Sequence, residues 1–255
     1  MLFLVFVGFL LVCNAAASPS LGGRIVGGEE TIIEFHPYQA ALQFRRGSQV
    51  FHHCGASIIS TKFLLTAAHC EPIWPHLFFA RVGATNFNEG GQLLKIESFI
   101  QHPKYFRPNL DYDYAVAGFA DGDEIVLSSS ALIAQLAPMN APDPVDGSLV
   151  CVSGWGYVDE IRPDTEFLRK VNLPVFNSRI CEQLTASWTP RHLCLGGTPE
   201  GYLSACFGDS GGPAMQNGIQ YALVSGGSSC FAPGEPGIYS KISVARDWID
   251  KVARL

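Results

Sequence analysis

Three short stretches carry the side chains that amide hydrolysis through a serine would need. CFGDSGGPA places Ser210 among glycines, LTAAHC ends an apolar run with His69, and LDYDYAVAGF carries Asp111 and Asp113 into a second apolar run. Such chemistry needs a base to take the hydroxyl proton, an acid to orient that base, and N–H donors for the developing oxyanion. Histidine suits the base because its ordinary pKa is near neutrality.

The elements that must position these side chains are mostly short strands. Apolar runs at 63–70, 112–119 and 221–227 are typical of strands, with Gly and Pro punctuating the chain between them. Residues 131–148 are rich in Ala and Pro and indicate a connector between two halves of similar size. This pattern favours an all-β barrel or sandwich.

One terminal helix is predicted at 243–255. Its periodicity places Val244, Trp248, Ile249 and Val252 on one face and charged residues on the other.

Four motifs together carry a family resemblance, although a GDSGG turn alone is usually only a turn. RIVGG, TAAHC, SGWG and GDSGGP stand in this order along the chain. The chain resembles the chymotrypsin-like (trypsin-fold) serine proteases over about residues 25–250. The resemblance implies two six-stranded antiparallel β-barrels with a C-terminal helix. The protease domain would span 25–255, with barrel 1 at about 25–135 and barrel 2 at about 136–255.

The resemblance also implies a role for each reactive side chain. Ser210 is expected to be the nucleophile and His69 the general base. Asp113 fits the family's frame for the orienting acid, which leaves Asp111 as an exposed turn residue. The N–H groups of Gly208 and Ser210 would form the oxyanion hole. Ser225 would support the buried aspartate and is also expected to be one of the substrate-binding residues.

Asp209 has a different expected role, in activation. In the family this aspartate pairs with the α-amine that is created when the chain is cut before IVGG, which here is the Arg24–Ile25 bond. Residues 18–24 would then be an activation peptide, and Arg24 implies a trypsin-like activating protease.

The expected specificity pocket is deep and neutral. Its floor residue maps to Ser204, where trypsin-like members carry an aspartate, and two wall positions map to Gly227 and Gly237. These residues predict cleavage after large apolar or aromatic residues. An elastase-like or collagenolytic protease is the alternative among enzymes, and a partner-binding homologue without catalysis is the alternative of another class. Gly226 departs from the family, because it stands where an aromatic residue usually forms an apolar platform beside the substrate.

The cysteines predict three disulfides, paired by position in the family: Cys54 with Cys70, Cys181 with Cys194, and Cys206 with Cys230. The expected partner of Cys151 reads Gln216, so Cys151 is predicted to be a free, buried thiol. No zinc site is expected because there is no CxxC pair. Calcium is not expected either, because Ala84 stands where the first acidic ligand of the trypsin calcium loop belongs.

The N-terminus predicts secretion. Leu2 to Val12 is an unbroken apolar run followed by Ala15-Ala16-Ala17, which indicates a cleaved signal peptide at 1–17. The net charge of −6 argues against nucleic acid. The mature chain is expected to be a secreted monomer without cofactor or metal, with no membrane segment. Protein and peptide substrates and protein protease inhibitors are its expected partners.

Overall fold

The structure is a computed structural model that describes residues 28–158, 166–197, 203–227 and 234–255. The predicted signal peptide, the predicted activation peptide with Arg24, Ile25 and Cys230 lie outside these ranges.

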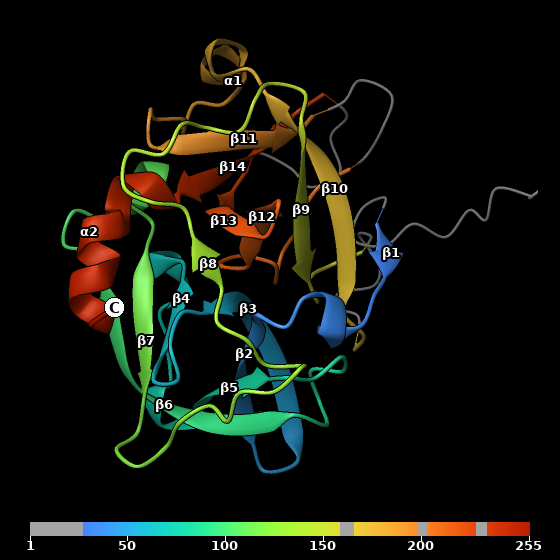
Figure 1. The fold of residues 1–255 in the computed structure, drawn as a ribbon, viewed down its shortest axis with the longest axis vertical. Helices are drawn as coiled ribbons and strands as arrows, with labels where there is room; N and C mark the ends of the chain where they lie inside the picture. The colour runs from blue at the N-terminus through green and yellow to red at the C-terminus, as the bar shows by residue number, and fades with distance from the viewer. Residues whose placement is uncertain (1–27, 159–165, 198–202, 228–233) are drawn as a thin grey trace, which may run out of the picture.

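Six antiparallel strands close the first barrel in the order β2-β3-β4-β7-β6-β5, in the lower half of Figure 1. Its interior is filled by aliphatic and aromatic side chains from every strand. The strands are β2 (Gln39–Arg46), β3 (Gln49–Ile58), β4 (Phe63–Thr66), β5 (Phe78–Val82), β6 (Gln92–Gln101) and β7 (Ala115–Phe119).

Six further antiparallel strands form the second barrel in the order β10-β11-β14-β13-β12-β9, and pairing of β9 with β10 closes it. It encloses a separate cluster of buried apolar side chains. The strands are β9 (Leu149–Gly154), β10 (Arg169–Phe176), β11 (His192–Gly196), β12 (Pro213–Gln216), β13 (Ile219–Gly226) and β14 (Pro236–Lys241). The predicted fold, all-β with two six-stranded antiparallel barrels, is confirmed.

Short elements join the two barrels. Strand β1 (Glu29–Glu30) pairs with β10, and β8 (Gln135–Leu136) pairs in parallel with β13. Within the described ranges, the other short elements are α1 (Ser178–Leu184) and four 3₁₀ helices, η1 (Ile33–Phe35), η2 (Ala68–Cys70), η3 (Pro75–Leu77) and η4 (Arg107–Asn109).

Helix α2 (Ile242–Ala253) confirms the predicted terminal helix, but its buried face differs from the predicted one. Val244 is exposed, and Trp248 and Val252 are only partly buried. The fully buried positions are Ile242, Ala245, Ile249 and Ala253, which pack on the core of the first barrel. The predicted face was built from larger apolar side chains and did not include Ala245 or Ala253. These small residues let the helix approach the barrel closely.

Two of the reactive side chains lie just outside the ends of strands. Strand β4 ends at Thr66, so His69 belongs to the 3₁₀ helix η2 that follows. Strand β7 begins at Ala115, and Tyr112 has a positive φ of 52°, so the chain turns directly before Asp113. The predicted strands at 63–70 and 112–119 are therefore shorter than expected, because the chain bends where it presents these side chains to the cleft.

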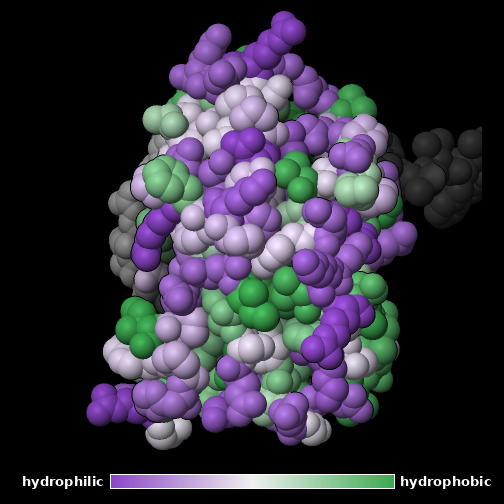
Figure 2. Space-filling model, turned by 90° about the vertical axis from the view of Figure 1, so that its left-hand side faces the viewer, coloured by the Kyte–Doolittle hydropathy of each residue, from purple (hydrophilic) through white to green (hydrophobic). Residues whose placement is uncertain are grey.

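Among the described residues, no helix is both long and apolar enough to cross a membrane. The face that carries α2 is mostly hydrophilic, with hydrophobic side chains gathered near its middle (Figure 2).

Candidate active site

Asp113 and His69 form the centre of the site. Asp113 is fully buried, and its Oδ2 lies 2.7 Å from Nδ1 of His69. Its Oδ1 accepts a hydrogen bond of 2.9 Å from the backbone N–H of His69. The hydroxyl of Ser225 donates to Oδ2 over 2.6 Å. The carboxylate is thus met by three donors, two of which hold the histidine in one orientation.

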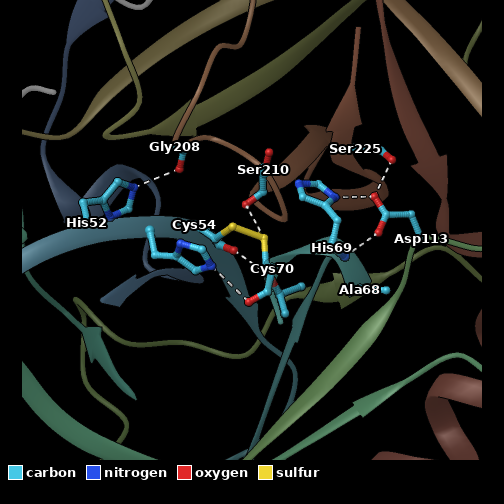
Figure 3. The surroundings of a disulfide bond; sticks show 12 residues. His52, Cys54, Ala68, His69, Cys70, Asp113, Gly208, Ser210 and Ser225 are labelled. Atoms are coloured by element: carbon cyan, nitrogen blue, oxygen red, sulfur yellow. Dashed lines mark hydrogen bonds and ion pairs between the residues drawn. A yellow bond between two sulfur atoms is a disulfide. The ribbon is translucent and has the colours of Figure 1, made fainter. Parts of the chain in front are cut away.

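This geometry selects one protonation form of the imidazole. An ionised carboxylate only accepts hydrogen bonds, so Nδ1 of neutral His69 carries the proton and Nε2 has the free lone pair. In Figure 3 the His69 ring lies between Asp113 and Ser210. His69 and Ser210 also line the same two cavities.

The loop that carries Ser210 is pressed against the first barrel. The carbonyl of Ser210 accepts a hydrogen bond of 2.8 Å from the N–H of Gly55 in β3. A Cβ at Gly211, whose φ is +79°, would lie 2.1 Å from the Thr66 hydroxyl oxygen. A Cβ at Gly55 would lie 2.9 Å from Gly212. These glycines therefore let the two barrels meet closely at the loop that carries Ser210, which is the expected nucleophile.

The N–H groups expected to form the oxyanion hole are available for a ligand. Within the described residues, neither the N–H of Gly208 nor that of Ser210 has an acceptor. Gly208 adopts a φ of +94°, and its carbonyl is held by Nε2 of His52 at 2.8 Å. Burial lowers the pKa of His52 to about 4, so His52 is neutral and donates Nε2–H to that carbonyl. The sequence analysis did not single out His52.

The Asp209 carboxylate lies against Gly154 and Gly156, at the end of β9. It is fully buried and accepts hydrogen bonds from the N–H groups of Gly156 (2.9 Å) and Cys206 (3.0 Å). A Cβ at Gly154 or Gly156 would overlap its carboxylate. The SGWG motif thus supplies the space and one donor for this side chain. Burial raises the pKa of Asp209 to about 6.

A cavity of about 380 Å³ opens beside Ser210 and brings together all four expected substrate-binding residues, Ser204, Ser225, Gly227 and Gly237. The Ser204 hydroxyl donates to the Ala205 carbonyl over 2.7 Å. Side chains at the two wall glycines would narrow the space, because a Cβ at Gly237 would lie 3.1 Å from the Tyr239 ring. Among the described residues that line the cavity there is no acidic side chain.

A second cavity is also lined by Ser210, and the aromatic rings of His52, Trp155, Tyr157 and Phe207 contribute to its walls. Phe207 and Tyr157 are in contact, with ring centroids 5.7 Å apart. Phe207 lines both cavities.

Two predicted disulfides are confirmed, Cys54–Cys70 and Cys181–Cys194. Cys206 is disulfide-bonded as well, but its predicted partner Cys230 lies outside the described residues. Cys151 is a free thiol as predicted, although it is half-buried rather than fully buried. Burial raises the pKa of this thiol, which makes it less reactive.

With this geometry established, comparison with known proteins identifies the family. The Trypsin family model matches residues 25–249. The chain belongs to the trypsin family. It is 36% identical to "Trypsin" of Simulium vittatum over 93% of this chain and 97% of that protein. It is 34% identical to "Hypodermin-B" of Hypoderma lineatum, covering 96% of this chain and 97% of that one. It is 32% identical to "Vitellin-degrading protease" of Bombyx mori, covering 97% and 93%.

Membership of the trypsin family makes this chain a serine endopeptidase, a hydrolase of peptide bonds.

One expectation for the site was wrong. Asp111 is not an exposed turn residue, because its carboxylate pairs with Arg191 through Nε at 2.5 Å and a second guanidinium nitrogen at 2.7 Å. Thr189 donates to it as well, over 3.1 Å. These partners lie about 80 residues away in sequence, so no local pattern could identify them.

Proposed function

We propose that this trypsin-family chain is a secreted serine endopeptidase that cleaves after large apolar or aromatic residues and is made as an inactive precursor. The observation that carries the specificity is the cavity beside Ser210. It has Ser204 at the expected floor position, glycine at both expected wall positions, and no acidic side chain among its described lining residues.

In the proposed mechanism, Nε2 of His69 takes the proton from Oγ of Ser210 as that oxygen attacks the peptide carbonyl carbon. The negative charge that develops on the carbonyl oxygen is met by the N–H groups of Gly208 and Ser210. The intermediate then collapses, and His69 gives the proton to the leaving amine. Water attacks the acyl-enzyme in the same way and regenerates the Ser210 hydroxyl. Asp113 remains ionised and stabilises the imidazolium.

The physical chemistry of the cavity supports an apolar preference. Phe and Tyr side chains bury roughly 150–250 Å² each, more than a small side chain does. At about 25 cal/mol per Å², that difference favours aromatic side chains over alanine by a few kcal/mol at most. A lysine or arginine would bury its charge beside a neutral hydroxyl, which is unfavourable. Arg107, which also lines this cavity, is basic and would repel a substrate lysine or arginine.

The Ser204→Asp variant tests this specificity. A carboxylate at the floor should attract a basic side chain, so kcat/KM for an Arg substrate should rise while that for a Phe substrate falls. Full trypsin-like rates are not expected, because surrounding loops also set the geometry. The measurement is kcat/KM of both proteins on matched substrates that differ only in Phe, Ala or Arg before the cleaved bond.

Two outcomes for the unmodified protein would overturn the proposed specificity. A preference for Arg would mean that Ser204 is not at the floor, and would agree with the relatives that are named trypsins. A preference for Ala would favour the elastase-like alternative. Labelling by a fluorophosphonate reagent tests the remaining alternative, because a homologue without catalysis would not react at Ser210.

Secretion and activation rest on the N-terminal sequence and on Asp209. The apolar run with Ala15-Ala16-Ala17 supports export, and the disulfides are typical of proteins in oxidising compartments. The buried Asp209 carboxylate supports activation by cleavage after Arg24, because a new Ile25 ammonium would supply the positive partner that such a group needs.

A further inference from the structure

Arg169 is a buried cation at the place where the N-terminal strand meets the second barrel. Its side chain is only 3% exposed. Its Nη1 donates to the Glu30 carboxylate over 2.9 Å, and its Nη2 donates to the Gly28 carbonyl over 3.4 Å. The guanidinium therefore binds the chain three and five residues after Ile25. Neither contact involves Ile25, so neither depends on cleavage before it.

The same arginine lies next to the strand that contacts Asp209. Arg169 of β10 is paired with Glu30 of β1 on one side and with Gly154 of β9 on the other. Figure 1 shows β10 between β9 and β1. A Cβ at Gly154 would lie 2.1 Å from Oδ1 of Asp209, so this end of β9 is in direct contact with the buried carboxylate.

The spacing of these strands suits a short tether between Gly28 and a new N-terminus. Neighbouring strands lie about 4.8 Å apart, so β1 is roughly 10 Å from β9 at this level. Three extended residues also span roughly 10 Å. A chain that is held at Gly28 can therefore bring an amine at position 25 to Asp209. A chain that is free at Gly28 must first lose the conformational freedom of several more residues.

We infer that Arg169 is a positioning residue for activation. It holds the N-terminal strand on β10, so that the Ile25 ammonium released by cleavage reaches Asp209 on a short tether. Such a tether raises the effective concentration of the amine at the carboxylate. Loss of the guanidinium should therefore weaken insertion of the new terminus without changing the residues that contact substrate. This inference rests on the proposed activation by cleavage.

The pH dependence of the cut enzyme reports the strength of this insertion. Pairing with Asp209 raises the pKa of the Ile25 amine above its ordinary value of about 7.7–8.0, and activity should be lost as the pH rises through the raised pKa. Each tenfold weakening of the pairing lowers that pKa by about one unit. Neighbouring groups do not titrate in this range, because burial raises the pKa of Tyr239 in β14 and lowers that of His52 in β3 to about 4.

The experiment compares Arg169→Met with the unmodified protein after both are cut by trypsin and the trypsin is inhibited. N-terminal sequencing checks that both chains begin at Ile25, and kcat/KM on one peptide substrate is followed as the pH is raised from neutral. The midpoint of the alkaline loss should fall by about one pH unit in Arg169→Met, which is a tenfold weakening of insertion. Arg169→Lys should give a smaller fall, because it keeps the charge but not the planar pair of donors.

Lys170→Met is the matched control. Lys170 is the next residue of β10 and pairs with Glu29 of β1, but their side chains are 32% and 73% exposed. Because an exposed pair contributes little, this midpoint should stay within about 0.2 pH unit of the unmodified one. Glu30→Gln alters an exposed side chain, so its folding is not at risk. Its midpoint should also fall, but by less than in Arg169→Met, since the amide oxygen still accepts a hydrogen bond.

The dipeptide Ile-Val separates the tether from the site that receives the amine. It copies the first two residues of the cut chain, so it should activate uncut Arg24→Gln by binding at Asp209. An untethered amine gains nothing from Arg169. Its half-activating concentration should therefore agree within about twofold between Arg24→Gln and the double variant Arg24→Gln with Arg169→Met.

An alkaline midpoint that is unchanged in both Arg169→Met and Glu30→Gln would overturn the inference. So would a tenfold higher Ile-Val requirement in the double variant, because Arg169 would then shape the site around Asp209 rather than the tether. Failure of the proposed activation is seen separately, either as full activity of uncut Arg24→Gln or as no activation of that chain by Ile-Val.

Discussion

At the scale of single residues, the buried carboxylate of Asp113 sets the chemistry of the site. A carboxylate that is buried away from water is stable only when hydrogen-bond donors contact it. The backbone and ring of His69 and the hydroxyl of Ser225 do so at 2.6 to 2.9 Å. These contacts also orient Nε2 of His69 away from Asp113, toward the nucleophile loop.

Ser210→Ala should abolish covalent catalysis with little change in the fold, since the substitution removes one oxygen at the cleft. The residual rate should be about 10³–10⁴-fold above that in water, because the oxyanion hole and substrate binding remain. Steady-state kinetics on a peptide substrate, with thermal unfolding as the check on folding, measure this. Activity within tenfold of the unmodified protein would contradict the assignment of Ser210 as nucleophile.

At the scale of elements, the segment 110–114, which carries Asp113, ties the first barrel to the second barrel. Asp111 pairs with Arg191, whose guanidinium also lies 5.1 Å from the centre of the Tyr112 ring. The Tyr114 hydroxyl donates to the Lys241 carbonyl over 2.7 Å. Because Ser210 belongs to the second barrel, these contacts help to fix the position of Asp113 relative to Ser210.

Asp111→Asn should lower both stability and turnover. The pair is largely shielded from water and bidentate, so its loss should lower the free energy of unfolding by about 1–2 kcal/mol and reduce kcat more than it raises KM. Burial raises the pKa of Asp111, but the hydrogen bond and charge of Arg191 outweigh it and lower the pKa. The contribution of the pair is therefore present above the unfolded carboxyl pKa and is lost as the pH falls through the lower folded value.

Urea unfolding and steady-state kinetics measure both effects. Glu124→Gln is the matched control, because the Lys62–Glu124 pair is exposed and lies within the first barrel. It should change the free energy of unfolding by less than about 1 kcal/mol and leave kcat unchanged. Equal effects of Asp111→Asn and Glu124→Gln would mean that the inter-barrel pair has no special role.

At the scale of the whole molecule, activation should depend on cleavage of the Arg24–Ile25 peptide bond, which is distant in sequence from the residues of the candidate active site. Arg24→Gln is expected to give a secreted, folded precursor that trypsin cannot activate, because the Ile25 ammonium is never released. The measurement is cleavage of a Phe substrate after trypsin treatment and trypsin inhibition, with N-terminal sequencing of the product. The unmodified chain, treated alike, should start at Ile25 and gain activity. Full activity of the uncut chain would refute this account.

The same precursor makes Asp209 visible in a pH titration of stability. No cation pairs with Asp209 among the described residues, and its pKa is about 6 in the folded chain against 3.8 as the ordinary value. The folded state then binds more protons than the unfolded state, so the free energy of unfolding should fall by up to about 3 kcal/mol between pH 4 and 6. Asp209→Asn should remove this fall. A Ser210→Ala chain that keeps Arg24 cannot digest itself, and cleavage of that chain at Arg24 should reduce the fall.

The sequence alone was enough to predict the fold, the family and the four expected residues of the cavity. RIVGG, TAAHC, SGWG and GDSGGP are local patterns, and their order along the chain places them in one architecture. The family resemblance also predicted three disulfides, of which Cys54–Cys70 and Cys181–Cys194 are confirmed, and a free Cys151. The motifs that carry the resemblance are recognised from the sequence because each depends on residue types at short, fixed spacing.

The tertiary structure alone decided which distant residues meet. Asp111 looks like a turn residue until Arg191 is brought to it from the second barrel. Gly226 looks like a lost platform until Leu110 is found 2.5 Å from where its Cβ would be. The reason for a glycine at position 211 is visible only when Thr66 is found 2.1 Å from where its Cβ would be. All three relations cross the seam between the barrels. Which residues come into contact across this seam depends on how the two barrels pack against each other. The spacing of residues within one segment of the chain does not determine that packing.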